Sequence, residues 1–230
     1  MSKIEERIEK LCPNGVEYKE LKEICCTISK GTLKTNEVVE IPDINNRFPV
    51  INAGKALYGY YDRFNNNFGF TVSARGEYAG VVNFFDTKFW AGGLCYPYKS
   101  KNESFSLTKF CYYYLKNIEK YIRGVLVSEG SIPALNKGDL DKVQIPVPPI
   151  EVQQEIVRIL DNFTELTTEL TTELTTELTA RRKQYEYYRD KLLTFEEPKI
   201  RFVTLNQIAK NFDFKRRPIS ESNRERGNIP

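Results

Sequence analysis

The chain has 230 residues, of which 40% are hydrophobic and 13% aromatic, enough for one ordinary domain plus an extension or for two small domains. Its formal net charge of +3 is too slight to argue for a nucleic-acid partner, so only local basic clusters can carry that argument. Histidine is absent, which excludes Ser-His-Asp and Cys-His nucleophiles, His-ligated zinc and histidine general bases.

No apolar run approaches the roughly 18 residues of a membrane span, and the first ten residues, MSKIEERIEK, are too charged for a signal peptide. The cysteines are odd in number and lack CxxC spacing, which predicts reduced thiols in a cytoplasmic protein. They are Cys12, Cys25, Cys26, Cys95 and Cys111. We expect neither a metal ion nor a cofactor.

Residues 1–148 are predicted to form a globular α/β (mixed α+β) domain. A short helix in residues 1–15 stops at a Pro-Asn-Gly turn, and residues 16–24 lead from a brief strand into a short helix. Glycine and asparagine turns then separate short β-like runs, typical of a twisted mixed sheet: 48–52, 58–61, 69–73 and 79–85. Apolar spacing predicts an amphipathic helix at 106–122, followed by a loop at 123–136.

Residues 149–195 are predicted to form one helix of about 45 residues and about 70 Å, opened by Pro149. Within it the tetrapeptide TELT occurs four times between Thr164 and Thr179. Four-residue spacing turns the leucine stripe by about 40° per step, so the stripe sweeps about 120°. Threonine is a mediocre helix former and glutamates four apart repel, so this helix needs a partner along its apolar face. The apolar positions are Ile156, Leu160, Phe163, Leu166, Leu170, Leu174, Leu178, Tyr185 and Leu192.

A second repeat links the two ends of the chain. The pattern aromatic-x-x-Leu-x-x-Ile occurs at 18–24 and again at 202–208, shortly after the long helix. Residues 196–230 are therefore predicted to be the truncated start of a second domain like the first, because so few residues cannot bury a core.

The junction before the long helix resembles one protein family. Residues 129–136 read EGSIPALN, and residues 145–161 read IPVPPIEVQQEIVRILD. Both resemble the junction in the specificity subunits of type I restriction–modification systems, where a target recognition domain ends in I-P-x-P-P and enters a long helix. The opening segment 11–18, LCPNGVEY, and the tandem four-residue repeat are similar to that family as well.

The resemblance implies a DNA-reading subunit without catalytic chemistry of its own. In that family two target recognition domains are held apart by antiparallel helices, each domain reads half of a split target, and methyltransferase and restriction subunits join the assembly. This chain has one such domain and one spacer helix. Because the leucine face needs a partner, we expect an antiparallel homodimer that reads a symmetric split site in double-stranded DNA.

Sequence-specific readers place Lys and Arg on phosphates and Arg, Asn, Gln, Ser and Tyr at base edges. Loops of that composition are predicted at 30–36, 55–60, 63–67, 73–78 and 123–131. The candidate DNA contacts in them are Lys30, Lys34, Lys55, Tyr58, Arg63, Asn65, Asn66, Ser73, Arg75, Tyr78, Arg123, Ser128 and Ser131. Arg75 is the strongest candidate, since Gly76 beside it lets the backbone approach DNA. The triplet 65–67 is equally compatible with a plain hairpin turn.

Two other functions stay open. A Mg²⁺-dependent endonuclease would use scattered carboxylates and a lysine, such as Asp43, Asp86 and Lys88, although residues 86–88 also fit a hairpin turn. A coiled-coil assembly protein would use the long helix alone and bind no DNA.

Overall fold

The structure is a computed structural model that describes residues 10–13, 15–195 and 203–210. Most of the helix predicted at 1–15, and residues 211–230 of the predicted second domain, lie outside the described residues. The chain divides into two compact units, 1–168 and 169–230, and each is described by itself.

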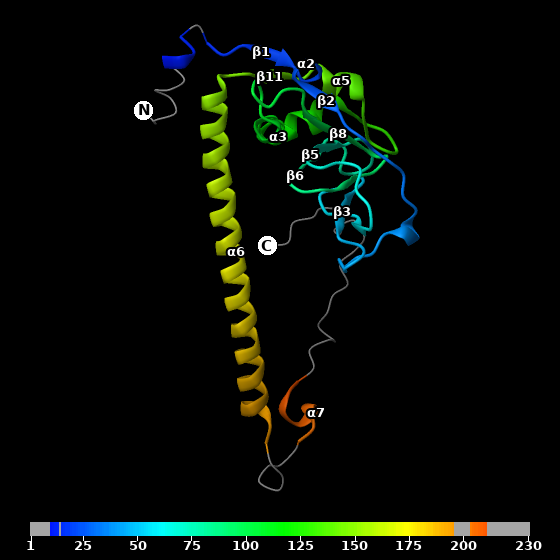
Figure 1. The fold of residues 1–230 in the computed structure, drawn as a ribbon. Coiled ribbons are helices and arrows are strands. Elements are labelled where there is room, and N and C mark those ends of the chain that lie inside the picture. Colours follow the sequence, from blue (N-terminus) through cyan, green and yellow to red (C-terminus); the bar gives the residue numbers. More distant parts are fainter. Residues whose placement is uncertain (1–9, 14, 196–202, 211–230) are drawn as a thin grey trace, which may run out of the picture. The chain divides into compact units, whose positions relative to one another are not determined.

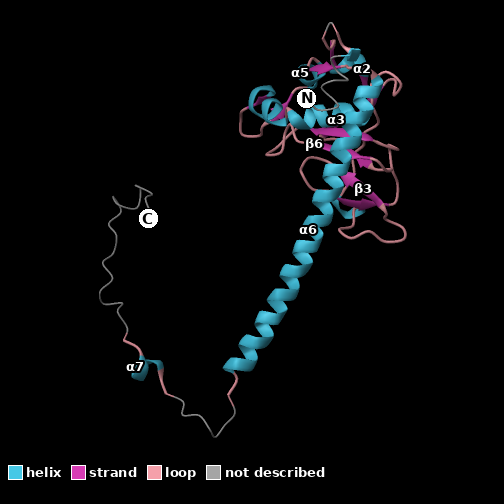
Figure 2. Cartoon of the chain, turned by 90° about the vertical axis from the view of Figure 1, so that its left-hand side faces the viewer, coloured by secondary structure: helices cyan, strands magenta, loops and turns pink. Residues whose placement is uncertain are grey.

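All strands of the described residues belong to the first unit, where they lie near α2, α3 and α5 (Figure 2). The strands are β1 (Tyr18–Glu20), β2 (Cys25–Thr27), β3 (Phe48–Ile51), β4 (Gly59–Tyr61), β5 (Gly69–Ser73), β6 (Val82–Phe85), β7 (Trp90–Ala91), β8 (Cys95–Ser100), β9 (Val127–Ser128), β10 (Ala134–Leu135) and β11 (Gln144–Pro146). The helices are α2 (Leu21–Ile24), the 3-10 helix η1 (Thr35–Glu37), α3 (Thr108–Asn117), α4 (Glu119–Tyr121), the π-helix η2 (Ile122–Leu126), α5 (Lys137–Asp141), α6 (Ile150–Leu193) and α7 (Leu205–Ile208).

The first unit is built around a four-stranded antiparallel sheet in the order β2-β8-β5-β6. Its inner strand β5 is buried at all five positions, and α3 packs against β5, β6 and β8 (Figure 1). Phe70 and Val72 of β5 share the main core with Leu115 of α3 and with Leu21 and Ile24 of α2. Each fully buried side chain of this size contributes about 1.5–3 kcal/mol, so α2 is part of the core despite its single turn.

A second sheet, β4-β3-β7, combines an antiparallel and a parallel pair, with Val50 of β3 opposite both Gly59 and Trp90. A smaller core joins it to the four-stranded sheet, because its members come from β3, β6, β7 and β8 and from the turn between β6 and β7. They are Ile51, Phe85, Phe89, Ala91 and Cys95. The expectation of a mixed α/β domain is thus confirmed.

The two ends of the domain meet in an antiparallel ribbon of β1 and β11, with Tyr18 opposite Pro146 (Figure 1). Leu21 continues this contact, since its backbone N–H donates to the carbonyl of Val143 at 2.9 Å. Helix α6 begins only four residues after Pro146, at Ile150. The ribbon therefore places the first segment of the domain beside the start of the long helix.

The prediction for residues 106–136 was partly wrong. The amphipathic helix is α3, which ends at Asn117, and the chain then continues through α4 and η2 as far as Leu126. The first four residues of the predicted loop at 123–136 are therefore helical, in a wide π-turn, and strands β9 and β10 pair within the remainder.

The long helix was predicted correctly: α6 has 44 residues, about 66 Å of helix, and follows directly on Pro149. Ile156 and Leu160 are half-buried, whereas the apolar side chains from Phe163 onward are exposed. Leu166 and Leu170 are 54% and 58% exposed, and Leu174 and Leu178 are each 69% exposed. The apolar stripe of the TELT repeat is therefore uncovered in a single chain.

The threonines of the repeat bond back into their own helix. The hydroxyls of Thr164, Thr167, Thr168, Thr175, Thr176 and Thr179 each donate to the carbonyl four residues earlier, at 2.7–2.8 Å. A hydroxyl with an internal acceptor can be covered by another helix without losing a hydrogen bond to water. The high threonine content is thus compatible with a helix that packs against a partner.

Helix α7 repeats the local structure of α2. Glu20 and Thr204 precede the two helices in extended conformation, and the backbone N–H of each donates to a side chain three residues later. The acceptors are the Glu23 carboxylate at 2.8 Å and the Gln207 amide oxygen at 2.9 Å. Both helices thus begin with a capping box, which satisfies the backbone groups at a helix start.

The apolar pair of this repeat differs in its surroundings. Leu21 and Ile24 are 0% and 3% exposed, whereas Leu205 and Ile208 are 73% and 70% exposed. The same sequence pattern therefore forms the same single helical turn twice. Its apolar pair is buried in the first copy and exposed in the second.

Candidate nucleic-acid interface

The segment 74–78, which we call the Arg75 loop, is fixed by its backbone. The N–H of Ala74 donates to the carbonyl of Leu94 at 2.8 Å, and the carbonyl of Ala74 accepts the N–H of Leu135 at 2.8 Å. The N–H of Gly76 donates to the carbonyl of Pro133 at 2.9 Å. Gly76 has φ +86°, which only glycine adopts without strain. The side chain of Arg75 is exposed, so a rigid loop presents a guanidinium to solvent.

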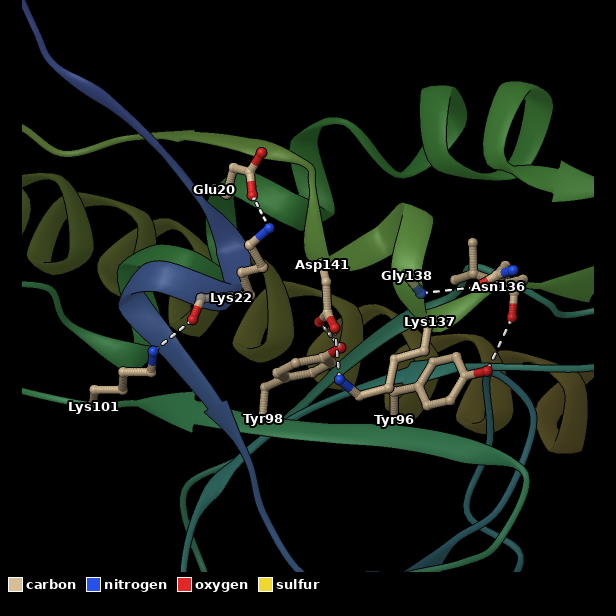
Figure 3. A network of polar contacts seen from close by, with 10 residues as sticks. Glu20, Lys22, Tyr96, Tyr98, Lys101, Asn136, Lys137, Gly138 and Asp141 are labelled. Atoms are coloured by element: carbon tan, nitrogen blue, oxygen red, sulfur yellow. Dashed lines mark hydrogen bonds and ion pairs between the residues drawn. The ribbon is translucent and has the colours of Figure 1, made fainter.

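The segment that pairs with the Arg75 loop is itself held by β8 (Figure 3). The hydroxyl of Tyr96 donates to the carbonyl of Leu135 at 3.1 Å, and that of Tyr98 donates to Asp141 of α5 at 2.7 Å. Lys137 also pairs with Asp141, at 2.6 Å. Burial, together with the bond to Asp141, raises the pKa of Tyr98, so its hydroxyl stays protonated and donates.

Two predicted lysines lie close to this loop. Nζ of Lys30 donates to the carbonyl of Gly93 at 3.3 Å and lies 5.3 Å from the centroid of the Tyr96 ring. Nζ of Lys55 lies 5.9 Å from the centroid of the Tyr78 ring, within the Arg75 loop. Lys55 therefore lies beside Tyr78 of the loop, while Lys30 lies beside Gly93, the residue before Leu94, whose carbonyl accepts the N–H of Ala74. The one acidic residue of the loop is Glu77.

Arg123 and Ser128 brace the loop from its other side. Nη2 of Arg123 donates to the backbone carbonyl of Glu77 at 3.1 Å, and the hydroxyl of Ser128 donates to that of Ala134 at 2.9 Å. Ser131 is exposed. The hollow beside them is lined by carboxylates as well as cations, which makes it a poor phosphate site: Glu77, Glu119, Lys120, Arg123 and Glu129.

Three of the predicted DNA contacts instead bond to groups within the domain, which contradicts their prediction as DNA-facing side chains. Ser73 is 1% exposed and accepts the N–H of Gly54 at 3.1 Å. The amide of Asn65 pairs with both backbone groups of Ala91, at 2.8 and 3.0 Å. Asn66 is 7% exposed and donates to the carbonyl of Ser29 at 2.7 Å. These side chains stabilise the fold, but residues 65–67 do not form a hairpin turn, because β4 before them and β5 after them belong to different sheets.

The remaining predicted contacts, Lys34, Tyr58 and Arg63, are exposed. Arg63 bonds to Tyr61 and belongs to a second basic and aromatic cluster, which the sequence interpretation missed. In it Arg47 lies 5.1 Å from the centroid of Phe48, and Lys88 lies 4.4 Å from that of Phe64. The signals of this cluster in the sequence are two basic–aromatic neighbours, Arg47 with Phe48 and Arg63 with Phe64.

Two residues of the endonuclease hypothesis, Asp43 and Lys88, have structural partners. Asp43 accepts the backbone N–H groups of Asn45 at 2.7 Å and Asn46 at 2.5 Å, which closes its own turn, and Lys88 lies over Phe64. Within the described ranges no group of three or more Cys, Asp or Glu side chains could hold a metal ion. The cysteines are free, and burial raises the pKa of Cys95 to about 12, which makes its thiol unreactive.

Comparisons with known proteins identify the family of the chain. Residues 13–180 match the family model for the type I restriction modification DNA specificity domain. A type I restriction enzyme specificity subunit from Escherichia coli is 31% identical over 206 residues, which cover 80% of this chain and 46% of that protein. Another from the same organism is 41% identical over 111 residues, 44% of this chain and 27% of that protein.

The crystal structure of a type I restriction–modification S subunit from M. genitalium has the same fold, with a TM-score of 0.57 at 20% identity, covering 80% of this chain and 48% of that one. The chain spans about half the length of the curated relatives that it matches first. Among the helices that the structure describes, none is both long and apolar enough to cross a membrane. With 168 of its 230 residues matched by the family model, the chain belongs to the type I restriction–modification DNA specificity family.

Proposed function

We propose that this chain is a DNA-specificity subunit of a type I restriction–modification system, and that its domain, residues 1–148, binds one half of a split target. The observation that carries the proposal is the Arg75 loop, where a hydrogen-bonded backbone presents the exposed Arg75 and where Lys55 lies beside Tyr78. Arginine and lysine supply the phosphate and base-edge contacts of sequence-specific readers. The chain contributes recognition and positioning, while methyltransferase and restriction subunits supply the chemistry in the cytoplasm.

The second part of the proposal is an antiparallel homodimer through α6. Four leucines of the TELT repeat are more than half exposed in a single chain, and burying each would contribute about 1.5–3 kcal/mol. An antiparallel copy would cover both stripes and place two identical domains at opposite ends of the helix pair. Such a dimer reads two inverted half-sites, because a two-fold axis relates its domains.

Residues 196–230 are proposed to be the start of a second target recognition domain. This rests on the capping box and the Leu-Ile pair that α7 shares with α2. In the first domain that pair is buried beside the β1–β11 ribbon, so the equivalent pair, Leu205 and Ile208, needs a similar core.

Methylation mapping tests the proposed function directly. The chain is co-expressed with the methyltransferase subunits of a type I system in a host that lacks adenine methylation, and modified sites are mapped. We expect a split motif whose two halves are inverted copies of each other. An asymmetric motif would rule out the homodimer. Absence of methylation, together with flat, negligible DNA binding across salt concentrations, would instead favour a coiled-coil assembly protein.

Arg75→Ala is expected to weaken binding to the mapped site by about 1–3 kcal/mol if Arg75 contacts a base, and to lower the salt slope by about 1 if it contacts a phosphate. Filter binding across a salt series, with specific and scrambled duplexes, separates the two cases. Arg158→Ala is the matched control, because Arg158 already pairs with Glu155 on the same helix at 2.8 Å. Equal affinities for Arg75→Ala and the unaltered chain would remove Arg75 from the interface.

A further inference from the structure

The first turn of α6 is attached to the domain by Gln153, which is fully buried. Its Oε1 accepts the N–H of Leu107 at 2.9 Å, and its Nε2 donates to the carbonyls of Phe105 at 3.0 Å and Pro148 at 2.8 Å. Leu107 is the residue that precedes α3. One side chain thus joins the starts of both helices, and a shorter or apolar replacement would leave buried backbone groups unpaired.

Two turns farther along, Asp161 joins α6 to α3 a second time. Its carboxylate accepts from Nζ of Lys109 at 2.8 Å and from the hydroxyl of Tyr113 at 2.6 Å. The two donors lie one turn apart on α3, and the Lys109 and Asp161 side chains are only 33% and 35% exposed. Burial, followed by the bond to Asp161, raises the pKa of Tyr113 to about 12, so this hydroxyl donates at neutral pH.

Helix α3 is in turn attached to the strands that lead to the Arg75 loop. Nζ of Lys116 donates to the carbonyl of Val82 at 3.1 Å, and the carboxylate of Glu119 in α4, which pairs with Lys116, accepts the N–H of Val82 at 2.9 Å. Val82 belongs to β6, which pairs with β5, and β5 ends two residues before Arg75. An unbroken series of contacts therefore connects α6 to the Arg75 loop through α3, β6 and β5.

We propose that Gln153 and Asp161 are positioning residues that fix the angle between α6 and the Arg75 loop, and thereby restrict the number of base pairs allowed between the two half-sites. One base pair more or less turns a half-site by about 35° around the DNA axis. The two attachments are about 12 Å apart along α6, so together they oppose tilting of the helix. With one of them removed, the helix can pivot about the other. This inference rests on the proposed function.

The test uses the full chain in complex with methyltransferase subunits and a set of duplexes that differ only in the spacer between the mapped half-sites. The unaltered chain is expected to favour one spacer length. Asp161→Ala is expected to raise methylation at neighbouring lengths, relative to the best length, by roughly tenfold, the factor that corresponds to losing a charge-assisted hydrogen bond. Tyr113→Phe keeps the ring, removes one donor and should broaden the preference less. If Asp161→Ala does not fold, the spacer preference of Tyr113→Phe tests the positioning role instead.

Glu155→Gln is the matched control, because it weakens an ion pair whose two members, Glu155 and Arg158, both lie on α6. It should leave the spacer preference unchanged. A sharp, unaltered preference in both Asp161→Ala and Tyr113→Phe would overturn the positioning role while leaving the proposed function intact. No methylation of any duplex by the unaltered complex would contradict the proposed function itself, and the positioning role with it.

Discussion

Deleting one TELT unit, residues 168–171, is expected to shorten the gap in the methylated motif by about one to two base pairs and to leave both half-sites unchanged. Four residues contribute about 6 Å of helix, and one base pair occupies about 3.4 Å of the DNA axis. The deletion also turns the remaining helix by only about 40° relative to its original phase, because four residues are close to one turn. The leucine stripe therefore continues across the deletion. Methylation mapping of both versions in the same host measures the gap.

The control for the deletion keeps the length of the helix. Thr168→Ala with Thr171→Ala alters the same unit without shortening it, and alanine is the better helix former, so the gap should not change. The hydroxyl of Thr168 donates to the carbonyl of Thr164 in the preceding turn at 2.8 Å, so the substitution removes a bond within the helix and keeps its length. An unaltered gap after the deletion would contradict the spacer role. An altered half-site would contradict it too, since α6 would then read bases.

The long helix could be predicted almost to the residue because its signals are local. The helix expected at 149–195 is observed as α6 at Ile150–Leu193. Proline before the helix and leucine every four residues act within a single turn, so no knowledge of distant contacts is needed. The short turn at 21–24 and its repeat at 205–208 were recognisable for the same reason.

Strand β8 was missed because Pro97 lies in its middle, and proline usually argues against an inner strand. In the structure Pro97 faces Thr71 on β5, while β2 pairs with β8 only from Tyr98 onward. The proline thus falls outside the doubly paired part of the strand. Its carbonyl still accepts the N–H of Ile28 at 3.0 Å.

The candidate interface was predictable only in part, because exposure of a polar side chain depends on partners far away in the sequence. Ser73 and Asn65 look like surface residues, yet their partners Gly54 and Ala91 lie 19 and 26 residues away. Gln153 was hidden for the same reason, since a polar residue in the first turn of a helix suggests solvent, while its partner Leu107 lies 46 residues earlier. For Arg75, which stays a predicted contact, the local signal of Gly76 agrees with the structure only in that Arg75 is exposed and Gly76 has a positive φ.

Leu170→Glu combined with Leu174→Glu is expected to convert the proposed homodimer to a monomer. In a two-fold dimer the pair of substitutions removes four buried leucines, about 1.5–3 kcal/mol each, and places four carboxylates in the interface. The dissociation constant should therefore rise by a factor of about 10³ or more. Light scattering at micromolar concentration should give a mass near the chain's 26.7 kDa instead of twice that value, and methylation should be lost.

Glu169→Ala with Glu173→Ala is the matched control, since it changes the same two turns without touching the leucine stripe. Removing two like charges four residues apart should leave the dimer intact and make the helix slightly more stable. Helical content measured by circular dichroism separates loss of the partner from loss of the helix, because the glutamate variants should retain their domain in either case. A mass of one chain for the unaltered protein would contradict the homodimer. A persistent dimer in the double glutamate variant would place the dimer contact away from the TELT stripe, on a surface that these leucines do not form.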